Sequence, residues 1–193
     1  MTRFVAHEGT YMLSHSVGLP LIGAEQAAAS AFWQPWQRGN ADIWHHWLAE
    51  IEAFRQQLAV LLNTEMANIC PQSSLSSAVS KIIYSLPSRP ERPVILLSEE
   101  DFPSIAFALQ KTASLGYQLK FIPADTDTSD LAQWDQQMSE EVGMVLVTHV
   151  QSNNGRQLPV QTITELARQK GILSLVDVAQ SAGIIPIDLQ QWQ

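Results

Sequence analysis

The sequence has one cysteine, no long apolar run and no cluster of basic residues. A single thiol, Cys70, excludes a disulfide within the chain and is typical of a reducing compartment, so we expect a cytoplasmic protein. We expect Cys70 itself to be buried and unreactive. No apolar stretch approaches the roughly 18 residues that span a bilayer. The N-terminus lacks the charged start and apolar core of a secretory signal, so we expect a soluble chain with no membrane partner.

Positive charge is also scarce. The chain has 11 lysine and arginine residues against 19 aspartate and glutamate residues, a formal net charge of −8. An acidic surface repels a phosphate backbone, so nucleic acid is not an expected partner. Glycine-rich nucleotide loops are missing. His45 and His46 are adjacent on a predicted helix and point in different directions, so we expect no metal site.

The 193 residues are enough for one globular domain with a hydrophobic core. Residues 1–22 read as irregular, and helices are predicted at 24–36 and 43–62, the second with Asp42 as its N-cap. Apolar residues recur in the second helix at the 3–4 spacing that predicts one buried face. They are Trp44, Trp47, Leu48, Ile51, Phe54, Leu58, Leu61 and Leu62.

From residue 69 onward, short apolar segments alternate with amphipathic ones. The predicted strands are 94–98, 119–124, 144–149 and 172–177, and the predicted helices are 73–86, 103–116, 129–140 and 159–171. This alternation predicts an α/β fold with a mostly parallel sheet flanked by helices. Ligands bind such sheets beyond the carboxyl ends of the strands.

Asp177 closes the last predicted strand, ILSLVD, at that edge. A carboxylate at the end of a buried strand is costly unless its charge is compensated. Two roles are open: Asp177 caps the following turn, or it faces a cationic ligand. No residue nearby in the sequence supplies the positive charge.

Two more features of this edge have an ordinary and a functional interpretation. The serines of QSSLSS (72–77) begin a helix, where they are either simple N-caps or part of an anion site at the helix N-terminus. Phe102 follows a strand and is either a core residue or an aromatic that stacks on a flat ligand. His149, at a strand end, either has a structural role or lines a pocket.

Together these segments resemble the N-terminal portion of the class V aminotransferase family of fold-type-I enzymes, which includes kynureninases and cysteine desulfurases. VDVAQSAGIIPIDL (176–189) is similar to the family's pyridine-binding segment, and LSEEDFPS (97–104) to the kynureninase version of its ring-stacking segment. TYMLSHSVGLP (10–20) and WQRGNADIWHHW (36–47) resemble kynureninase N-termini. The resemblance implies part of the large domain of that fold, with pyridoxal 5'-phosphate (PLP) as cofactor and an amino acid as substrate.

The resemblance also implies residue roles around the cofactor ring. Asp177 would pair with the protonated pyridine nitrogen, which keeps the ring an electron sink. Gln180 would approach the phenolic oxygen, and Phe102 would stack on the ring. Ser152 or Asn153 would add a polar contact near the ring.

The phosphate and the lysine are the remaining parts of such a site. The resemblance implies that the backbone of Leu75 and the backbone and hydroxyl of Ser76 hold the phosphate. Class V enzymes bind the cofactor through a Schiff-base lysine on a strand after the aspartate segment, and the chain ends at Gln193 before that strand. No catalytic residue is therefore expected in this chain, whose lysines are Lys81, Lys111, Lys120 and Lys170. Ile105 stands where kynureninases tend to have an acid.

The expected organisation is an N-terminal segment with helices at 1–68 and a PLP-binding large domain at 69–193, truncated before the lysine. The full-length parent would form a homodimer and carry out transfer or side-chain cleavage on an amino acid. The chain alone would be inactive. The alternatives are a non-catalytic remnant or pseudoenzyme interaction domain of the same fold, and an unrelated α/β binding domain in which Asp177 is only a cap.

Overall fold

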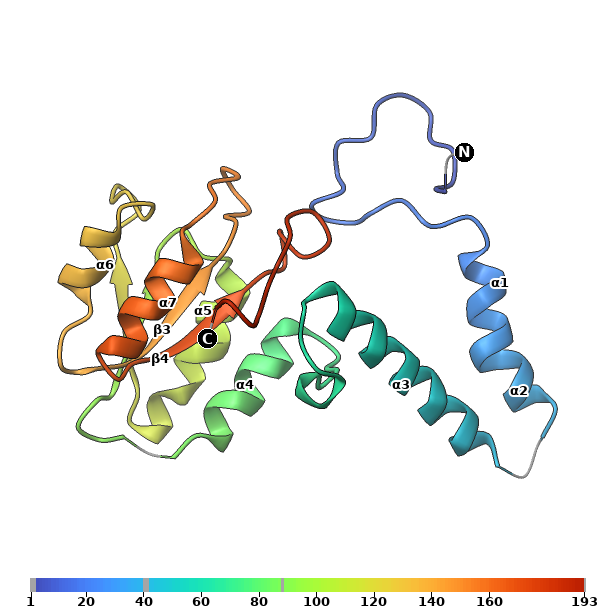
Figure 1. The fold of residues 1–193 in the computed structure, drawn as a ribbon, viewed down its shortest axis with the longest axis horizontal. Coiled ribbons are helices and arrows are strands. Elements are labelled where there is room, and N and C mark those ends of the chain that lie inside the picture. The colour runs from blue at the N-terminus through green and yellow to red at the C-terminus, as the bar shows by residue number, and fades with distance from the viewer. Residues whose placement is uncertain (1–2, 40–41, 88, 193) are drawn as a thin grey trace. The chain divides into compact units, whose positions relative to one another are not determined.

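The computed structural model describes residues 3–39, 42–87 and 89–192. The chain divides into two compact units, one of residues 1–60 and 65–71 and the other of residues 61–64 and 72–193. The first is helical and the second is built around a β-sheet. Figure 1 shows the elements of both units.

The helical unit contains the two helices that the sequence predicts. In the first, α1 (Ala24–Ala28) leads into a π-helical stretch, η1 (Ala29–Trp33), and then into α2 (Gln34–Gln37). The second is α3 (Ile43–Leu61), followed by a short 3-10 turn, η2 (Met66–Asn68). Asp42 Oδ1 accepts a hydrogen bond of 3.2 Å from the His45 amide, which confirms the predicted N-cap.

The predicted buried face of α3 is wrong for the described chain. Ala59 is the one buried residue of the helix, whereas Trp44 is 68% exposed and Phe54 is 53% exposed. The periodic stripe exists, but most of it is exposed in the described chain. Cys70, also expected to be buried, is exposed because it lies in the irregular segment between η2 and α4.

The second unit is an α/β unit with a four-stranded parallel sheet. Its strands are β1 (Val94–Ser98), β2 (Gln118–Ile122), β3 (Val142–Thr148) and β4 (Leu173–Asp177), in the order β2-β1-β3-β4. The helices are α4 (Leu75–Ser85), α5 (Pro103–Gln110) with its 3-10 extension η3 (Lys111–Leu115), α6 (Leu131–Gln137) and α7 (Val160–Gln169). Every predicted strand and helix of this unit is confirmed, and so is the α/β fold class.

The helices cover both faces of the sheet (Figure 1). Side chains of a strand alternate between faces, so Leu96 packs in one hydrophobic cluster while its neighbours Ile95 and Leu97 pack in the other. The first cluster includes residues of α6 and α7, and the second includes residues of α4 and α5. β1 and β3 are therefore buried throughout.

Trp134 of α6 is the largest fully buried side chain among the described residues. Its indole Nε1 donates a 2.8 Å hydrogen bond to the Thr128 carbonyl oxygen, so the one polar atom of the ring is satisfied inside the core. The helix begins at Asp130, whose Oδ1 accepts from the Ala132 amide at 3.0 Å.

A β-bulge shapes the start of β3. Val94 of β1 pairs with Val142, and the next residue, Ile95, pairs with Met144, so Gly143 is the extra residue. A Cβ atom on Gly143 would lie 2.3 Å from the backbone oxygen of Arg92. Only glycine fits this close approach. The strand starts at Val142, two residues earlier than the sequence predicts.

The parallel arrangement brings the carboxyl ends of all four strands to one edge. Thr148, the last residue of β3, is in register with Asp177, the last residue of β4. The segments after β1 and β3 and the N-terminus of α4 complete this edge, where the candidate site lies. In the described ranges, no helix has the length and apolar composition to cross a bilayer.

Candidate functional site

A pocket of about 170 Å³ lies at the carboxyl edge of the sheet. A cavity of roughly 150 Å³ can bind benzene, so this one has room for a substituted six-membered ring. Its walls come from the N-termini of α4 and α5, the segments after β3 and β4, and the strand ends. The lining residues are Leu75, Phe102, Ser104, Thr148, Val150, Ser152, Asp177, Ala179 and Gln180.

Five of the six residues that the sequence proposes for cofactor binding line this one pocket. They are Leu75, Phe102, Ser152, Asp177 and Gln180. Ser76, the sixth, is not a lining residue, although it follows Leu75 in the first turn of α4. Asn153, the alternative to Ser152, does not line the pocket either. The fold thus brings together residues that are about 100 positions apart in the sequence.

Asp177 has the capping role that the sequence offered as one alternative. Its side chain is 5% exposed, and its Oδ1 accepts a 2.8 Å hydrogen bond from the Ala179 amide, which caps the turn. The same side chain lines the pocket. Burial raises the pKa of Asp177 because the ionised form loses hydration, and the hydrogen bond from Ala179 opposes that shift.

Phe102 is not a core residue. Its side chain is 50% exposed, and it occupies the N-cap position of α5, where Pro103 begins the helix. An aromatic ring left half exposed at the edge of a pocket can cover the face of a flat ligand.

The N-terminus of α4 forms a further wall of the pocket. Ser74 is the N-cap, and its Oγ accepts a 3.1 Å hydrogen bond from the Ser77 amide, so the ordinary interpretation of the serine cluster is confirmed for this residue. Leu75 is the first residue of the helix and lines the pocket. Backbone amides of a first helical turn lack intrahelical partners and lie at the positive end of the helix dipole, an arrangement that favours an anion.

A second buried carboxylate, Asp101, directly precedes the pocket residue Phe102, lines a separate hollow, and was missed from the sequence. Its side chain is 6% exposed. Its Oδ2 accepts from the Ser98 amide at 2.8 Å, and its Oδ1 accepts from Gln151 Nε2 at 3.2 Å. Burial and, to a smaller degree, repulsion by Asp177 raise the pKa of Asp101, while its hydrogen bonds oppose the shift. Its position after β1 and before Phe102 is the signal that could have found it.

His149 meets both alternatives that the sequence offered, since hydrogen bonds tie it into the fold and it also lines a separate hollow with Gln157 and Trp192. Its side chain is 3% exposed, its Nδ1 lies 2.9 Å from Ser181 Oγ, and its amide donates to the Asp177 carbonyl oxygen at 2.8 Å. Burial lowers the pKa of His149, so the ring is neutral at physiological pH. The residue ties the end of β3 to the turn after β4.

The rim of the pocket is held by polar contacts between loops. Glu100 Oε1 accepts a 2.8 Å hydrogen bond from Asn154 Nδ2. Arg156 Nη1 lies 3.6 Å from carboxylate oxygens of both Glu100 and Asp127. These contacts join the turn that contains Ser152 to the loop that contains Phe102.

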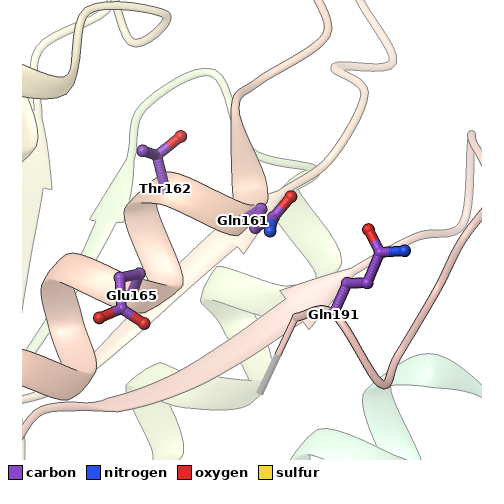
Figure 2. A pocket seen from close by; sticks show the side chains of 4 residues that line it. All are labelled: Gln161, Thr162, Glu165 and Gln191. Atoms are coloured by element: carbon purple, nitrogen blue, oxygen red, sulfur yellow. The ribbon is translucent and has the colours of Figure 1, made fainter.

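Another hollow on the α/β unit has fewer side chains that could bind a ligand. It is lined by Gln161, Thr162 and Glu165 of α7 and by Gln191 from the C-terminal segment, whose side chains are drawn in Figure 2. Its one carboxylate, Glu165, pairs with Arg168 and accepts a 2.8 Å hydrogen bond from Gln169 on the same helix. None of the predicted site residues lines it.

All four lysines fall in the described part of the chain, and none of them lines the pocket at the carboxyl edge. Lys81 in α4 donates to the Gln72 side chain, and Lys120 in β2 donates to the Gln137 carbonyl at 3.3 Å. Lys170 donates to the Asp135 carbonyl at 2.9 Å. Lys111 begins η3.

A parallel sheet covered on both faces, with its pocket at the carboxyl edge, defines an α/β domain with the usual place for a ligand site. Its fold is found in the cystine C–S lyase C-DES, solved as a mutant with glycine covalently linked to its PLP cofactor. The two chains superpose with a TM-score of 0.84 at 22% identity, over 93% of this chain and 49% of C-DES. A NifS-like protein superposes with a TM-score of 0.64 at 19% identity, over 74% of this chain and 40% of that one.

The sequence comparison identifies the family. The model of the class-V aminotransferases matches residues 29–193, and the chain belongs to this family, as its motifs predict. The uncharacterized aminotransferase YcbU of Bacillus subtilis is 30% identical over 77% of this chain and 40% of its own length. The kynureninase of Pseudomonas fluorescens is 26% identical over 98% of this chain and 47% of its own length. The chain therefore spans less than half the length of these relatives.

Family membership excludes the interpretation as an unrelated α/β binding domain. Enzymes of this family use PLP and act on amino-acid substrates.

Proposed function

We propose that this chain is the cofactor-binding N-terminal part of a PLP-dependent class V enzyme that acts on an amino acid by kynureninase-like or cysteine-desulfurase-like chemistry. The observation that carries the proposal is the single pocket in which Asp177, Phe102, Gln180, Leu75 and Ser152 meet. In this proposal residues 69–193 form the PLP-binding large domain and residues 1–68 precede it. The full-length parent is a cytoplasmic homodimer.

The pocket fits the pyridine ring of PLP in charge and shape. Asp177 is a buried carboxylate, and within the α/β unit none of the described lysines, arginines or histidines forms an ion pair with it. A protonated ring nitrogen would supply the missing positive charge. It would stabilise the ionised form of Asp177, which burial otherwise disfavours. Asp177 then holds the proton on that nitrogen.

The remaining walls fit the other parts of the cofactor. The exposed ring of Phe102 would stack on one face of the pyridine ring. Gln180 would approach the phenolic oxygen, and Ser152 would add a polar contact. The first turn of α4, at Leu75 and Ser76, would hold the phosphate through backbone amides and the Ser76 hydroxyl.

When bound, PLP supplies an electron sink for bonds at the α-carbon of an amino acid. The chain's own contribution is to bind and orient the ring and to keep its nitrogen protonated. Since none of the four lysines lines the pocket, we expect little or no turnover from these 193 residues alone.

The position of the lysines favours one alternative, a non-catalytic remnant or pseudoenzyme domain of the same fold. The coding sequence downstream of Gln193 separates the two proposals. A continuing frame with a lysine-bearing strand supports the enzyme, and a stop codon directly after Gln193 supports the remnant.

Titration of the chain with PLP, followed by fluorescence or equilibrium dialysis, tests the proposed site. We expect Asp177→Ala to weaken binding by about tenfold or more, since it removes a charge-assisted hydrogen bond. The matched control is Asp125→Ala, which removes an exposed carboxylate outside the pocket and leaves the affinity unchanged. Equal PLP affinities for the unaltered chain and a folded Asp177→Ala variant would remove the central assignment.

A further inference from the structure

Two buried carboxylates, Asp101 and Asp177, lie at the same edge of the sheet. Asp101 follows β1, Asp177 ends β4, and β3 runs between these strands. Adjacent strands are about 4.8 Å apart, so the two carboxylates are separated by roughly two strand spacings. Both are more than nine-tenths buried, at 6% and 5% exposure.

The two groups differ in what they face. Asp177 lines the pocket, whereas Asp101 does not, although its neighbour Phe102 and the intervening Thr148 both do. Burial is the main cause that raises the pKa of Asp101, and the negative charge of Asp177 adds to it in the same direction. Within the described residues of the α/β unit, neither carboxylate forms an ion pair.

Asp101 is held in a fixed orientation. The Ser98 amide donates to one of its oxygens at 2.8 Å and Gln151 Nε2 donates to the other at 3.2 Å. Gln151 is 1% exposed, and its other side-chain atom, Oε1, is buried without a hydrogen-bond partner in the described chain. Two donors on one carboxyl group favour its ionised form. The Gln151 side chain thus directs its NH₂ group toward Asp101 and leaves its Oε1 without a hydrogen-bond partner in the described chain.

We propose that Asp101 is a positioning residue of the pocket, whose carboxylate adds a second negative charge behind Asp177 and strengthens the binding of a protonated pyridine ring. This inference rests on the proposed function, because it concerns the same ligand in the same pocket. Asp101 acts through the electrostatic potential at Asp177 and does not touch the ring. Two buried carboxylates at this edge, neither in an ion pair among the described residues of the α/β unit, favour a ligand that carries positive charge on its ring.

Asp101→Asn removes the charge and can keep the hydrogen bonds. The amide oxygen of the new side chain accepts from Ser98, and its NH₂ group donates to Gln151 Oε1 once the Gln151 amide turns over. The buried oxygen that has no partner in the present structure gains one in the variant. A loss of cofactor affinity in this variant therefore reports the charge.

The test compares two ligands on the same 193-residue chain. One is PLP, and the other is its carbocyclic analogue, in which a C–H group replaces the ring nitrogen. We expect Asp101→Asn to weaken PLP binding by about threefold to tenfold, the effect of one charge at this separation in a partly polar interior. The affinity for the analogue is expected to stay within about twofold, since it has no charge on the ring.

Glu140→Gln is the matched control, because it removes the same charge from an exposed residue near the amino end of β3, the opposite edge of the sheet. It is expected to leave both affinities unchanged. Equal weakening of both ligands by Asp101→Asn, or no weakening of either, would overturn the role of Asp101. Failure of the unaltered chain to bind PLP would instead overturn the proposed function, and this inference with it.

Discussion

At the scale of the residue, Asp177 is a charge that the unliganded fold does not compensate. Its side chain accepts a hydrogen bond from the Ala179 amide, and burial raises its pKa above the ordinary value of 3.8. A carboxyl group whose pKa is raised by folding binds its proton more tightly in the folded chain than in the unfolded one. Its contribution therefore lowers the free energy of unfolding as the pH rises from 3.8 through the higher folded-state pKa.

We predict that Asp177→Asn stabilises the chain at neutral pH in the absence of cofactor. The amide keeps the oxygen that accepts from Ala179 and loses the buried charge, so the free energy of unfolding should rise by about 1 kcal/mol. Urea denaturation at about pH 7 and about pH 4 measures the effect, which should shrink at the lower pH. The exposed Asp125→Asn variant is the control. A destabilised Asp177→Asn variant at neutral pH would show that the carboxylate is already compensated.

Residue by residue, the sequence predicts the positions that line the pocket better than it predicts the residues around them. Asp177 and Phe102 follow from the family resemblance, and the structure places both in one pocket. Local sequence could not show that Phe102 is half exposed, because an aromatic after a strand packs inward as readily as outward. Asp101 was missed because its burial depends on Gln151, 50 positions away, folding onto it.

At the scale of the element, β3 depends on one glycine. The predicted strand begins at Met144, whereas the structure continues the strand through a bulge at Gly143 to Val142. Helix and strand identity follow from periodicity, but a bulge depends on the approach of another chain segment, here the backbone of Arg92.

We predict that Gly143→Ala destabilises the α/β unit. Its Cβ would lie 2.3 Å from the Arg92 carbonyl oxygen, a backbone atom that can move only with β1. The free energy of unfolding should fall by roughly 1–3 kcal/mol, measured by urea denaturation. Gly18→Ala has open space around its Cβ and should change the value by less than about 0.5 kcal/mol. Equal stability of the two variants would contradict the bulge as a steric requirement.

The apolar face of α3 shows that periodicity predicts a helix and its apolar side but not whether that side is buried. The 3–4 spacing correctly predicts a helix and an apolar stripe, yet Trp44 and Phe54 are exposed in the structure. A periodic stripe shows which side of a helix is apolar, and burial of that side requires a partner that the stripe does not specify.

At the scale of the whole molecule, the sheet order β2-β1-β3-β4 sets the geometry of the site. The alternation of strands and helices predicts a parallel sheet, but it does not fix which strands are neighbours. That order results from the pairing of segments far apart in sequence, such as β1 with β3. The pocket depends on this strand order, because the order places the segments after β1, β3 and β4 side by side.

We predict that the chain binds PLP without forming a covalent bond to it. None of its four lysines lines the pocket. Borohydride reduction of the chain with one equivalent of PLP, followed by mass spectrometry of peptides, should therefore leave the chain mass unchanged. As a control, a large excess of PLP should label the exposed lysines at random. Stoichiometric labelling of one lysine by the single equivalent would contradict the predicted absence of a cofactor lysine.

The unequal placement of the six tryptophans has an optical consequence. Trp134 is fully buried in the α/β unit, while Trp33, Trp36 and Trp44 of the helical unit are more than half exposed. A buried indole emits at shorter wavelength than a hydrated one, so the blue side of the emission spectrum reports mainly the sheet and its helices. Denaturation followed at two wavelengths can then distinguish the loosening of the helical unit from the unfolding of the α/β unit, without any label on the chain.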